Sequence, residues 1–453
     1  MIKTIEGQLT SNDMRKLSPY YVDVPEGTTQ VHVQFDYTPE HPAGHEFRHQ
    51  LSLMVCDPDG PRLGISKPGK DGAFINAVKP SPGGLPAPIK AGQWTIFVLV
   101  YRLLTPEQPV DFTLKITMTS DEISGTPEEW IPGVVTSRGR GWYRGDLHAH
   151  TIHSDGSLDV PELVQYWRDR KVDFMTLSDH DTISGLGQVR SLADDDLLTM
   201  GGTEISTFLG HAVAVGVQEW FDWRTLDGEQ VPIPEIAKKV IASGALFTIA
   251  HPRDEGEPWC CGCRWLHEDM MPGNALAVEI WNGYWSENNE EALRLFYSWL
   301  NRGHRIVATS GTDLHHLPPK DAKGRDAVNV VFADDLTETD IIAGIKAGRS
   351  YISAGPELNF TALSESGIEG MIGDTLPAEH ATIHVGWNDA HVGDVLRLIV
   401  DGMPYAETPI TDVSGHLTWK LSKVAKWCTV ELRQPKNGLW AVTNPILFEG
   451  TTS

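Results

Sequence analysis

The chain has 453 residues, of which 40% are hydrophobic and 22% charged; this length allows about three domains, and the composition excludes a disordered or fibrous protein. Its 37 Lys and Arg against 61 Asp and Glu give a formal net charge of -24 at pH 7, which repels polyanions and argues against long nucleic acids as partners. A small phosphorylated substrate stays open, because bound cations can reverse the potential inside a pocket.

The start of the chain and its cysteines bear on the compartment. Residues 1–10 lack the basic start and apolar core of a signal peptide, and no apolar run approaches the ~18 residues of a membrane span. We therefore predict a cytoplasmic protein with no membrane partner. Cys260, Cys261 and Cys263 crowd into one short segment. Their spacing fits neither an evenly paired disulfide framework nor a zinc ribbon, so we expect reduced thiols there.

Residues 1–135 carry short apolar alternations separated by Pro and Gly, a pattern typical of an antiparallel β-sandwich. The clearest strand candidates are 31–37, 51–55 and 94–100. A stretch rich in Pro and Gly at 126–140 follows them and predicts a linker.

From residue 141 the pattern changes to apolar strands that alternate with amphipathic helices, which predicts a barrel or layered α/β domain over 141–355. The expected strands are 172–177, 246–250, 277–281 and 306–309. The expected helices are 161–170, 234–243, 289–300 and 337–347; Pro161 favours the start of the first, and a glycine ends each of the other three.

After residue 355 the strand pattern returns. The candidates are 358–362, 382–387, 395–400, 416–421, 428–432 and 439–442. Short strands at this spacing predict a second small sandwich, immunoglobulin-like, over 356–453.

The middle third contains the segment GDLHAHTIHSDGS, in which His148 and His150 follow a strand two residues apart. Side chains alternate along a strand, so both imidazoles face the same way and can chelate one ion. An isolated pair of this kind is more often structural. Whether this pair binds a metal therefore depends on which other ligand residues lie at the predicted strand ends.

Further ligand types recur at predicted strand ends. LSDHD places His180 at a carboxyl end, where α/β enzymes collect functional groups, and GGTEIST places Glu204, a carboxylate able to bridge two cations. The full set is His148, His150, Asp155, His180, Glu204, His211, His251, Asp313 and His315. These six imidazoles and three carboxylates exceed what one ion takes from a protein, so we predict two or three divalent metals. Ligation by nitrogen and oxygen without thiolate suits Mn, Zn or Fe.

In this order, the segments DLHAHTIHSDGS, LSDHDTISG, TEIS, IAHP and SGTDLHH resemble the ligand motifs of the polymerase and histidinol phosphatase (PHP) superfamily. The segments VEIWNG, WLNRGHRIVATSGTDLHH and IKAGRSYISAGPELNF resemble its CehA/McbA branch, which includes carbaryl hydrolases. The resemblance covers 141–355. It implies a distorted seven-stranded β/α barrel with the metals at the carboxyl ends of its strands, flanked here by the N-terminal and C-terminal sandwiches.

Position by position, the resemblance implies where each metal sits. One metal would lie on His148, His150, Glu204 and Asp313, a second on Glu204, His211 and His251, and a third on Asp155, His180 and His315. Every one of these positions holds a competent ligand. The segment HPRDEGEPWCCGCRW, which begins at His251, departs from the family pattern and leaves the substrate open.

Such a site predicts hydrolysis by a hydroxide held between cations. Asp181, next to His180, is a candidate for orienting a ligand or shuttling a proton, and equally for capping the turn that follows. Arg253 and Arg264 are candidate phosphate-binding cations, with solvation or a surface salt bridge as the alternative.

Small-molecule phosphoesters are the leading substrate class, because their hydrolysis is the commonest activity in the superfamily. Aryl carbamates or carboxylic esters are the alternative; they need an apolar wall, which Trp259, Trp265, Trp281 and Trp285 would supply unless they pack in the core. A third hypothesis is non-catalytic: the sandwiches bind carbohydrate or protein, and the metal domain is a scaffold. An exposed sandwich edge would also allow a homodimer.

Overall fold

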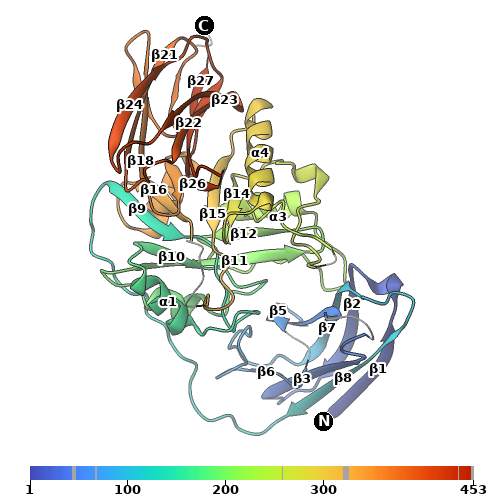
Figure 1. Ribbon diagram of the computed structural model, residues 1–453. Coiled ribbons are helices and arrows are strands. Elements are labelled where there is room, and N and C mark those ends of the chain that lie inside the picture. Colours follow the sequence, from blue (N-terminus) through green and yellow to red (C-terminus); the bar gives the residue numbers. More distant parts are fainter. Residues whose placement is uncertain (43–46, 67–68, 258, 320–325, 437, 450–453) are drawn as a thin grey trace.

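The computed structural model describes residues 1–42, 47–66, 69–257, 259–319, 326–436 and 438–449. Figure 1 shows three parts in chain order. A sandwich of strands at the N-terminus is followed by a middle part in which helices lie beside a long sheet, and strands again make up the C-terminal part. The first and last parts lie at opposite ends of the middle part.

The N-terminal part consists of two four-stranded sheets that share one apolar core. One sheet has the order β1 (Ile2–Leu9), β8 (Val110–Thr119), β3 (Gln30–Thr38) and β6 (Gly69–Asn76). The other has the order β2 (Lys16–Val24), β7 (Gly92–Arg102), β4 (Gln50–Asp57) and β5 (Gly60–Ser66). The predicted strands 31–37, 51–55 and 94–100 lie within β3, β4 and β7. A short 3-10 helix at Ser11–Asp13 joins β1 to β2.

Strand β7 is buried on both faces over most of its length, unlike a strand of a free-standing sandwich. Ile96 and Val98 point into the sandwich core, whereas Phe97 and Leu99 belong to the core of the middle part. Tyr101 also crosses this boundary, with its ring 5.0 Å from that of Phe208. The N-terminal sandwich therefore packs firmly against the domain that carries the predicted ligands.

The middle part is built on seven strands that lie side by side in chain order. They are β9 (Gly141–Asp146), β10 (Phe174–Leu177), β11 (Leu198–Thr207), β12 (Gly210–Val215), β13 (Leu246–Ile249), β14 (Ala277–Asn282) and β15 (Val307–Gly311). The first three are parallel, β12 is antiparallel to both of its neighbours, and the last three are parallel. The sheet is mixed because the short turn between β11 and β12 makes a hairpin and leaves no room for a crossover helix.

The strand pairing of the described residues neither confirms nor excludes the predicted distorted β/α barrel, because it shows no clear closure. Within the described residues no strand ladder joins β15 to β9; instead β16 (Val328–Ala333) pairs antiparallel with β9. The segments that follow β9 and β15 do meet, through an isolated parallel bridge between Ala149 and Leu314. The seven-stranded β/α barrel therefore stays a prediction, whereas a mixed sheet that brings these two ends together is observed.

The helices flank this sheet, and three of the five begin at a side-chain cap. They are α1 (Val160–Asp169), α2 (Leu186–Ser191), α3 (Ile233–Ala242), α4 (Glu287–Asn301) and α5 (Glu338–Lys346), with a 3-10 turn at Glu268–Met270. Asp159 and Glu162 form a capping box at α1. Ser286 caps α4, which begins at Glu287, two residues before the start expected from sequence. In the described chain, none of the helices combines the length and apolarity needed to cross a bilayer.

One sheet of the C-terminal part continues the sheet of the middle part, and a second sheet is separate. Strand β17 (Ser350–Ser353) pairs with β16 on one side and with β26 (Leu439–Thr443) on the other. This sheet goes on to β25 (Trp427–Arg433), β22 (Val395–Val400) and β23 (Met403–Pro409), with β20 (Thr375–Pro377) and β27 (Ile446–Glu449) attached. A second sheet of β19 (Glu369–Met371), β18 (Glu357–Ser364), β21 (Ala381–Asn388) and β24 (Gly415–Lys420) completes the C-terminal part.

Candidate metal centre

All the predicted metal ligands converge at the ends of the middle strands. His148, His150 and Asp155 follow β9, His180 follows β10, Glu204 and His211 lie in the β11–β12 hairpin, His251 follows β13, and Asp313 and His315 follow β15. Three overlapping groups have ligand atoms within 4.8 Å of one another. Residues separated by up to 167 positions in sequence are thus brought together by the order of the strands.

Glu204 lies at the centre of the cluster and is completely buried. Its Oε2 is 3.2 Å from His148 Nε2 and 3.3 Å from His150 Nε2. Asp313 faces the same two imidazoles, with its Oδ1 2.9 Å from His150 Nε2 and 3.3 Å from His148 Nε2. These four side chains form one of the three groups and match the first implied metal site.

The other oxygen of Glu204 faces the second implied site. Its Oε1 is 3.1 Å from His211 Nδ1 and 3.1 Å from His251 Nε2. His180 also approaches Glu204, with Nδ1 2.9 Å from Oε2, so His180, Glu204 and His211 make up another group. One carboxylate therefore contacts the imidazoles of two implied sites, as a bridging ligand would.

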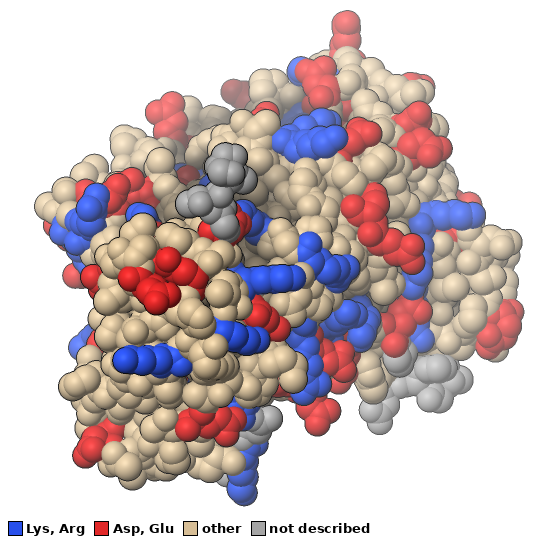
Figure 2. Space-filling model, turned by 90° about the horizontal axis from the view of Figure 1, so that it is seen from above, with Lys and Arg blue, Asp and Glu red and all other residues tan. Residues whose placement is uncertain are grey.

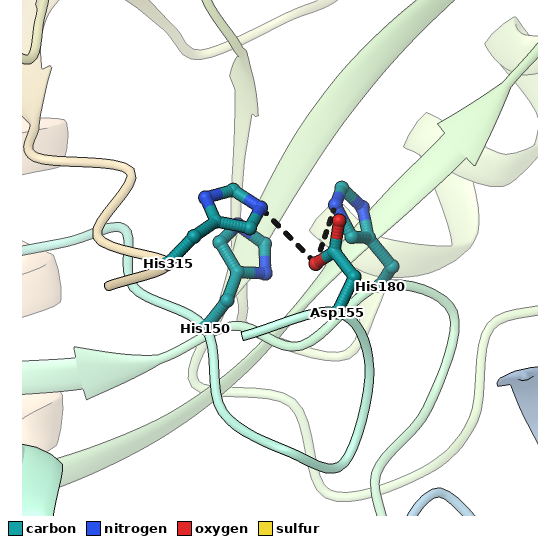
Figure 3. Close-up of side chains that lie close together, drawn as sticks. All are labelled: His150, Asp155, His180 and His315. Atoms are coloured by element: carbon teal, nitrogen blue, oxygen red, sulfur yellow. Dashed lines mark ion pairs between the residues drawn. The ribbon is translucent and has the colours of Figure 1, made fainter. Parts of the chain in front are cut away.

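Asp155 gathers the third group, which Figure 3 shows in close-up. Its Oδ1 is 3.0 Å from His315 Nε2 and 3.4 Å from His180 Nε2. His150 lies between these two rings, with ring centroids 4.2 Å from His315 and 4.4 Å from His180. The resemblance places Asp155, His180 and His315 together, and the structure adds His150 to them.

The donor set fits divalent cations. In the described part of the chain, His150 Nδ1, Glu204 Oε2, Asp313 Oδ1 and His211 Nε2 are buried and have no hydrogen-bond partner. Burying such atoms without a partner costs free energy, and a cation bound between Glu204 Oε2 and Asp313 Oδ1 would remove that cost for these two oxygens. Imidazole nitrogens and carboxylate oxygens together suit Mn, Zn or Fe.

The carboxylates also hold protons on the imidazoles. Burial disfavours the charged form of His180, but Glu204 and Asp155 outweigh it and raise the pKa of His180 to about 10. Burial likewise opposes the charge of His251, yet contact with Glu204 raises its pKa to about 9. His211 behaves differently, because burial prevails and lowers its pKa.

We predict that cation binding at pH 7 releases protons. A group with a raised pKa stays protonated below that pKa, so the cation must displace protons from His180 and His251, and its affinity rises as the pH increases toward 9. Calorimetric titration of metal-free protein with Mn²⁺ in two buffers of different ionisation enthalpy measures this release. Heats that are equal in both buffers would contradict it.

Glu279, a buried carboxylate that the sequence analysis missed, supports the cluster from behind. Its Oε1 is 3.1 Å from His148 Nδ1, and its Oε2 accepts a hydrogen bond of 3.0 Å from the backbone N–H of His251. Asn282 also donates to it, at 2.9 Å. A hydrogen bond at Nδ1 fixes the tautomer of His148 and leaves Nε2 facing the other ligands. The sequence signal that could have revealed Glu279 was a charged residue among the apolar residues Ala277–Trp281 of strand β14.

Asp181 lies beside His180 in sequence, but its carboxylate turns away from the cluster. It accepts hydrogen bonds from the backbone of Ser206 and from Trp223 Nε1, both at 3.2 Å, and pairs with Arg224 at 3.3 Å. The pair with Arg224 is fully desolvated. These contacts engage both oxygens of Asp181 and anchor the turn that carries His180. They favour an orienting role over a proton shuttle, and the role of Asp181 stays a prediction.

The two candidate arginines lie at the edge of the site. Arg253 lines a cavity of about 30 Å³ together with His251 and Glu279. Burial lowers the pKa of Arg253, and the charge of Arg264 lowers it further. Arg264 is 3.7 Å from Glu291 and half-exposed. Arg253 is thus next to the ligands, whereas Arg264 is farther out and partly neutralised.

The expectation of reduced thiols in the cysteine segment is wrong for two of the three. Cys260 and Cys263 form a disulfide with Cα atoms 5.5 Å apart, because a tight turn brings these near neighbours within bonding reach. Cys261 between them stays a free, buried thiol, as do Cys56 and Cys428.

No protein-family model matches the chain. Among curated proteins, it is similar to a 5'-3' exoribonuclease of Haemophilus influenzae, with 42% identity over 65 residues, which are 14% of this chain and 23% of that protein. Among solved structures, a two-domain protein of Bacteroides vulgatus containing a predicted PHP-like metal-dependent phosphoesterase superposes with a TM-score of 0.39 at 14% identity, over 71% of this chain and all of that one. An amidohydrolase of Chromobacterium violaceum gives a TM-score of 0.28 at 16% identity, over 38% of this chain and 88% of that one. Superpositions this partial carry no conclusion about activity, so PHP membership stays a prediction from the motifs.

Proposed function

We propose that the chain is a metal-dependent hydrolase that acts on small-molecule phosphoesters. The observation that carries this proposal is the position of Glu204, whose two oxygens contact five imidazoles at 2.9 to 3.3 Å. His148, His150, Glu204 and Asp313 would hold one cation, and Glu204, His211 and His251 a second. Asp155, His180 and His315 would hold a third. Bound cations lower the pKa of water toward neutrality and polarise the bond to be broken.

The remaining residues of the site would position these ligands and the substrate. Glu279 fixes the ring of His148, and the ion pair of Asp181 with Arg224 holds the turn of His180. Arg253, beside His251, would bind the anionic group of the substrate through charge-assisted hydrogen bonds.

Phosphoesters are favoured over aryl carbamates and carboxylic esters by what surrounds the ligands. The apolar wall needed for an aromatic substrate does not form from Trp265 and Trp281, which are fully buried in the core. Trp285 packs against Trp281, and Trp259 against Phe47 of the N-terminal part. The short match to an exoribonuclease also supports phosphoester chemistry.

A small substrate fits the charge of the molecule better than a long nucleic acid does. The formal net charge is -24, and Figure 2 shows Lys and Arg interspersed with Asp and Glu over the face in view. Such a surface gives a polyanion no extended basic track on that face. A homodimer and a cytoplasmic location are further proposals from the sequence.

Turnover of three substrate classes tests the proposal. After loading with Mn²⁺ or Zn²⁺, the protein is offered p-nitrophenyl phosphates, 1-naphthyl carbamate and 1-naphthyl acetate. We expect the phosphates to be hydrolysed fastest. Faster turnover of the carbamate or acetate would favour the alternative ester class. No turnover of a broad ester panel, together with tight glycan binding, would favour the non-catalytic alternative.

Replacing Arg253 with Ala should raise KM for a phosphate monoester by about 10-fold with a smaller effect on kcat, since a hydrogen bond to a charged group contributes ~1.5–3 kcal/mol. Arg294→Ala is the matched control, because Arg294 is largely exposed on α4 and pairs only loosely with Glu290. Steady-state kinetics of both variants measure the difference. Equal KM values for Arg253→Ala and the control would show that Arg253 does not bind the substrate.

A further inference from the structure

The disulfide between Cys260 and Cys263 lies directly over the two imidazoles that face Glu204 Oε1. The carbonyl oxygen of Cys263 is 2.8 Å from His251 Nδ1. Gly262, between the two cysteines, packs so closely that a Cβ there would lie 2.9 Å from His211 Nε2 and 2.5 Å from the carbonyl of Thr207. Its φ of +91° is one that other residues rarely adopt. The disulfide turn, residues 260–263, therefore covers both of these ligands.

The two bonded cysteines are half-buried and the thiol between them is buried. A small dithiol can therefore approach the disulfide while Cys261 stays in the core. Trp259 and the first half of the turn are tied to the N-terminal sandwich, because the side chain of Gln50 donates to the carbonyl of Trp259 at 2.8 Å and accepts from the backbone N–H of Cys261 at 3.0 Å. Opening the disulfide would thus free Gly262 and Cys263 more than the residues before them.

We propose that the Cys260–Cys263 disulfide is a redox-active site that controls cation binding at His211 and His251, with a small dithiol as its co-reactant. The inference rests on the metal centre of the proposed function. One thiolate of the dithiol attacks a sulfur of the disulfide and forms a mixed disulfide, and the second thiolate then displaces the protein sulfur. The protein disulfide gains two electrons and two protons and becomes two thiols, while the dithiol is oxidised to its own disulfide.

The link to the cation runs through the tautomer of His251. When its Nδ1–H donates to the Cys263 carbonyl, Nε2, which lies 3.1 Å from Glu204 Oε1, is the nitrogen that binds a cation once its proton is displaced. His251 also has a φ of +25°, a backbone conformation that needs support from its surroundings. Without the disulfide, the carbonyl of Cys263 is no longer fixed. Loss of such a supporting contact weakens cation binding by roughly 10- to 100-fold.

The test measures cation binding as a function of thiol state. Mn²⁺ is the probe, because it prefers nitrogen and oxygen and gains little from newly formed thiols. Bound Mn²⁺ per chain is determined by elemental analysis across buffered free concentrations. The samples are oxidised protein, protein reduced with dithiothreitol and desalted without oxygen, and the variant Cys260→Ser/Cys263→Ser. Cys261→Ala is the control in the same turn, since it keeps the disulfide, and His251→Ala removes the ligand itself.

We expect one Mn²⁺ of the oxidised protein to require about 10-fold or more higher free concentration after reduction, with the remaining Mn²⁺ unchanged. The double serine variant should match reduced protein, Cys261→Ala should match oxidised protein, and His251→Ala should not respond to reduction. Identical Mn²⁺ binding before and after reduction would overturn the inference, and so would five free thiols in oxidised protein. If oxidised protein bound no Mn²⁺ at all, the proposed function itself would fail.

Discussion

Replacing Glu204 with Gln is expected to remove the two cations that it would bridge and to lower hydrolysis by roughly 100-fold or more, since even supporting contacts to metal ligands are worth 10- to 100-fold. Glu204 is completely buried, and both of its oxygens face imidazoles. The variant keeps the size of the side chain but loses the charge that bridges two cations. Elemental analysis and turnover of p-nitrophenyl phosphate measure the two effects.

Glu128→Gln is the control for this variant, because Glu128 is an exposed carboxylate of the segment between the N-terminal and middle parts. Circular dichroism of both variants checks that the fold is retained. A folded Glu204→Gln protein with normal cation content and turnover would contradict the bridging role.

Replacing Glu279 with Gln should weaken cation binding by about 10- to 100-fold while leaving the fold intact. The carboxylate of Glu279 contacts His148 Nδ1 and the backbone N–H of His251, and so supports ligands of two implied sites. The side-chain amide of Gln has one oxygen acceptor where Glu has two, so one of these contacts loses its acceptor. Cation affinity, measured by competition with a chelator, is the readout that a purely structural role would not move.

Glu291→Gln provides the comparison for Glu279, because Glu291 is about half-exposed on α4 and its carboxylate pairs with Arg264 at 3.7 Å. Equal cation affinity in the two variants would show that Glu279 supports the fold and not the ligands. A lower affinity in Glu279→Gln with an unchanged unfolding temperature of the metal-free protein would support the positioning role.

The ligands could be predicted from sequence because each lies at or near a strand end. A strand end is readable from apolar pattern, and the order of strands then brings His148, Glu204 and Asp313 together. How the ligands are shared is not readable in this way. His150 and His180 each belong to two groups, which depends on side-chain directions that only the folded chain defines.

The supporting residues and the sheet topology were harder to predict. Glu279 lies among apolar residues of strand β14, and the sequence pattern does not show which residues a charged side chain at that position contacts. Asp181 has the right neighbour in sequence, but its partner Arg224 comes from a distant loop. The antiparallel strand β12 interrupts the alternation of strands and helices. The pairing of β17 with β26 joins the middle and C-terminal sheets, so the domain boundary expected from the strand pattern does not separate two sheets.

The pairing of the cysteines could not be predicted from sequence spacing either. A spacing of three residues between Cys260 and Cys263 is compatible with free thiols or with a bond, and the turn geometry decides between them. Its position over His251 also follows from the fold and not from the spacing.

The most direct test of the metal centre is anomalous diffraction from a crystal of Mn²⁺-loaded protein. We predict at least two peaks inside the cluster, with one beside each oxygen of Glu204. A map with no peak between Glu204 and the surrounding imidazoles, from protein at saturating Mn²⁺, would contradict the account.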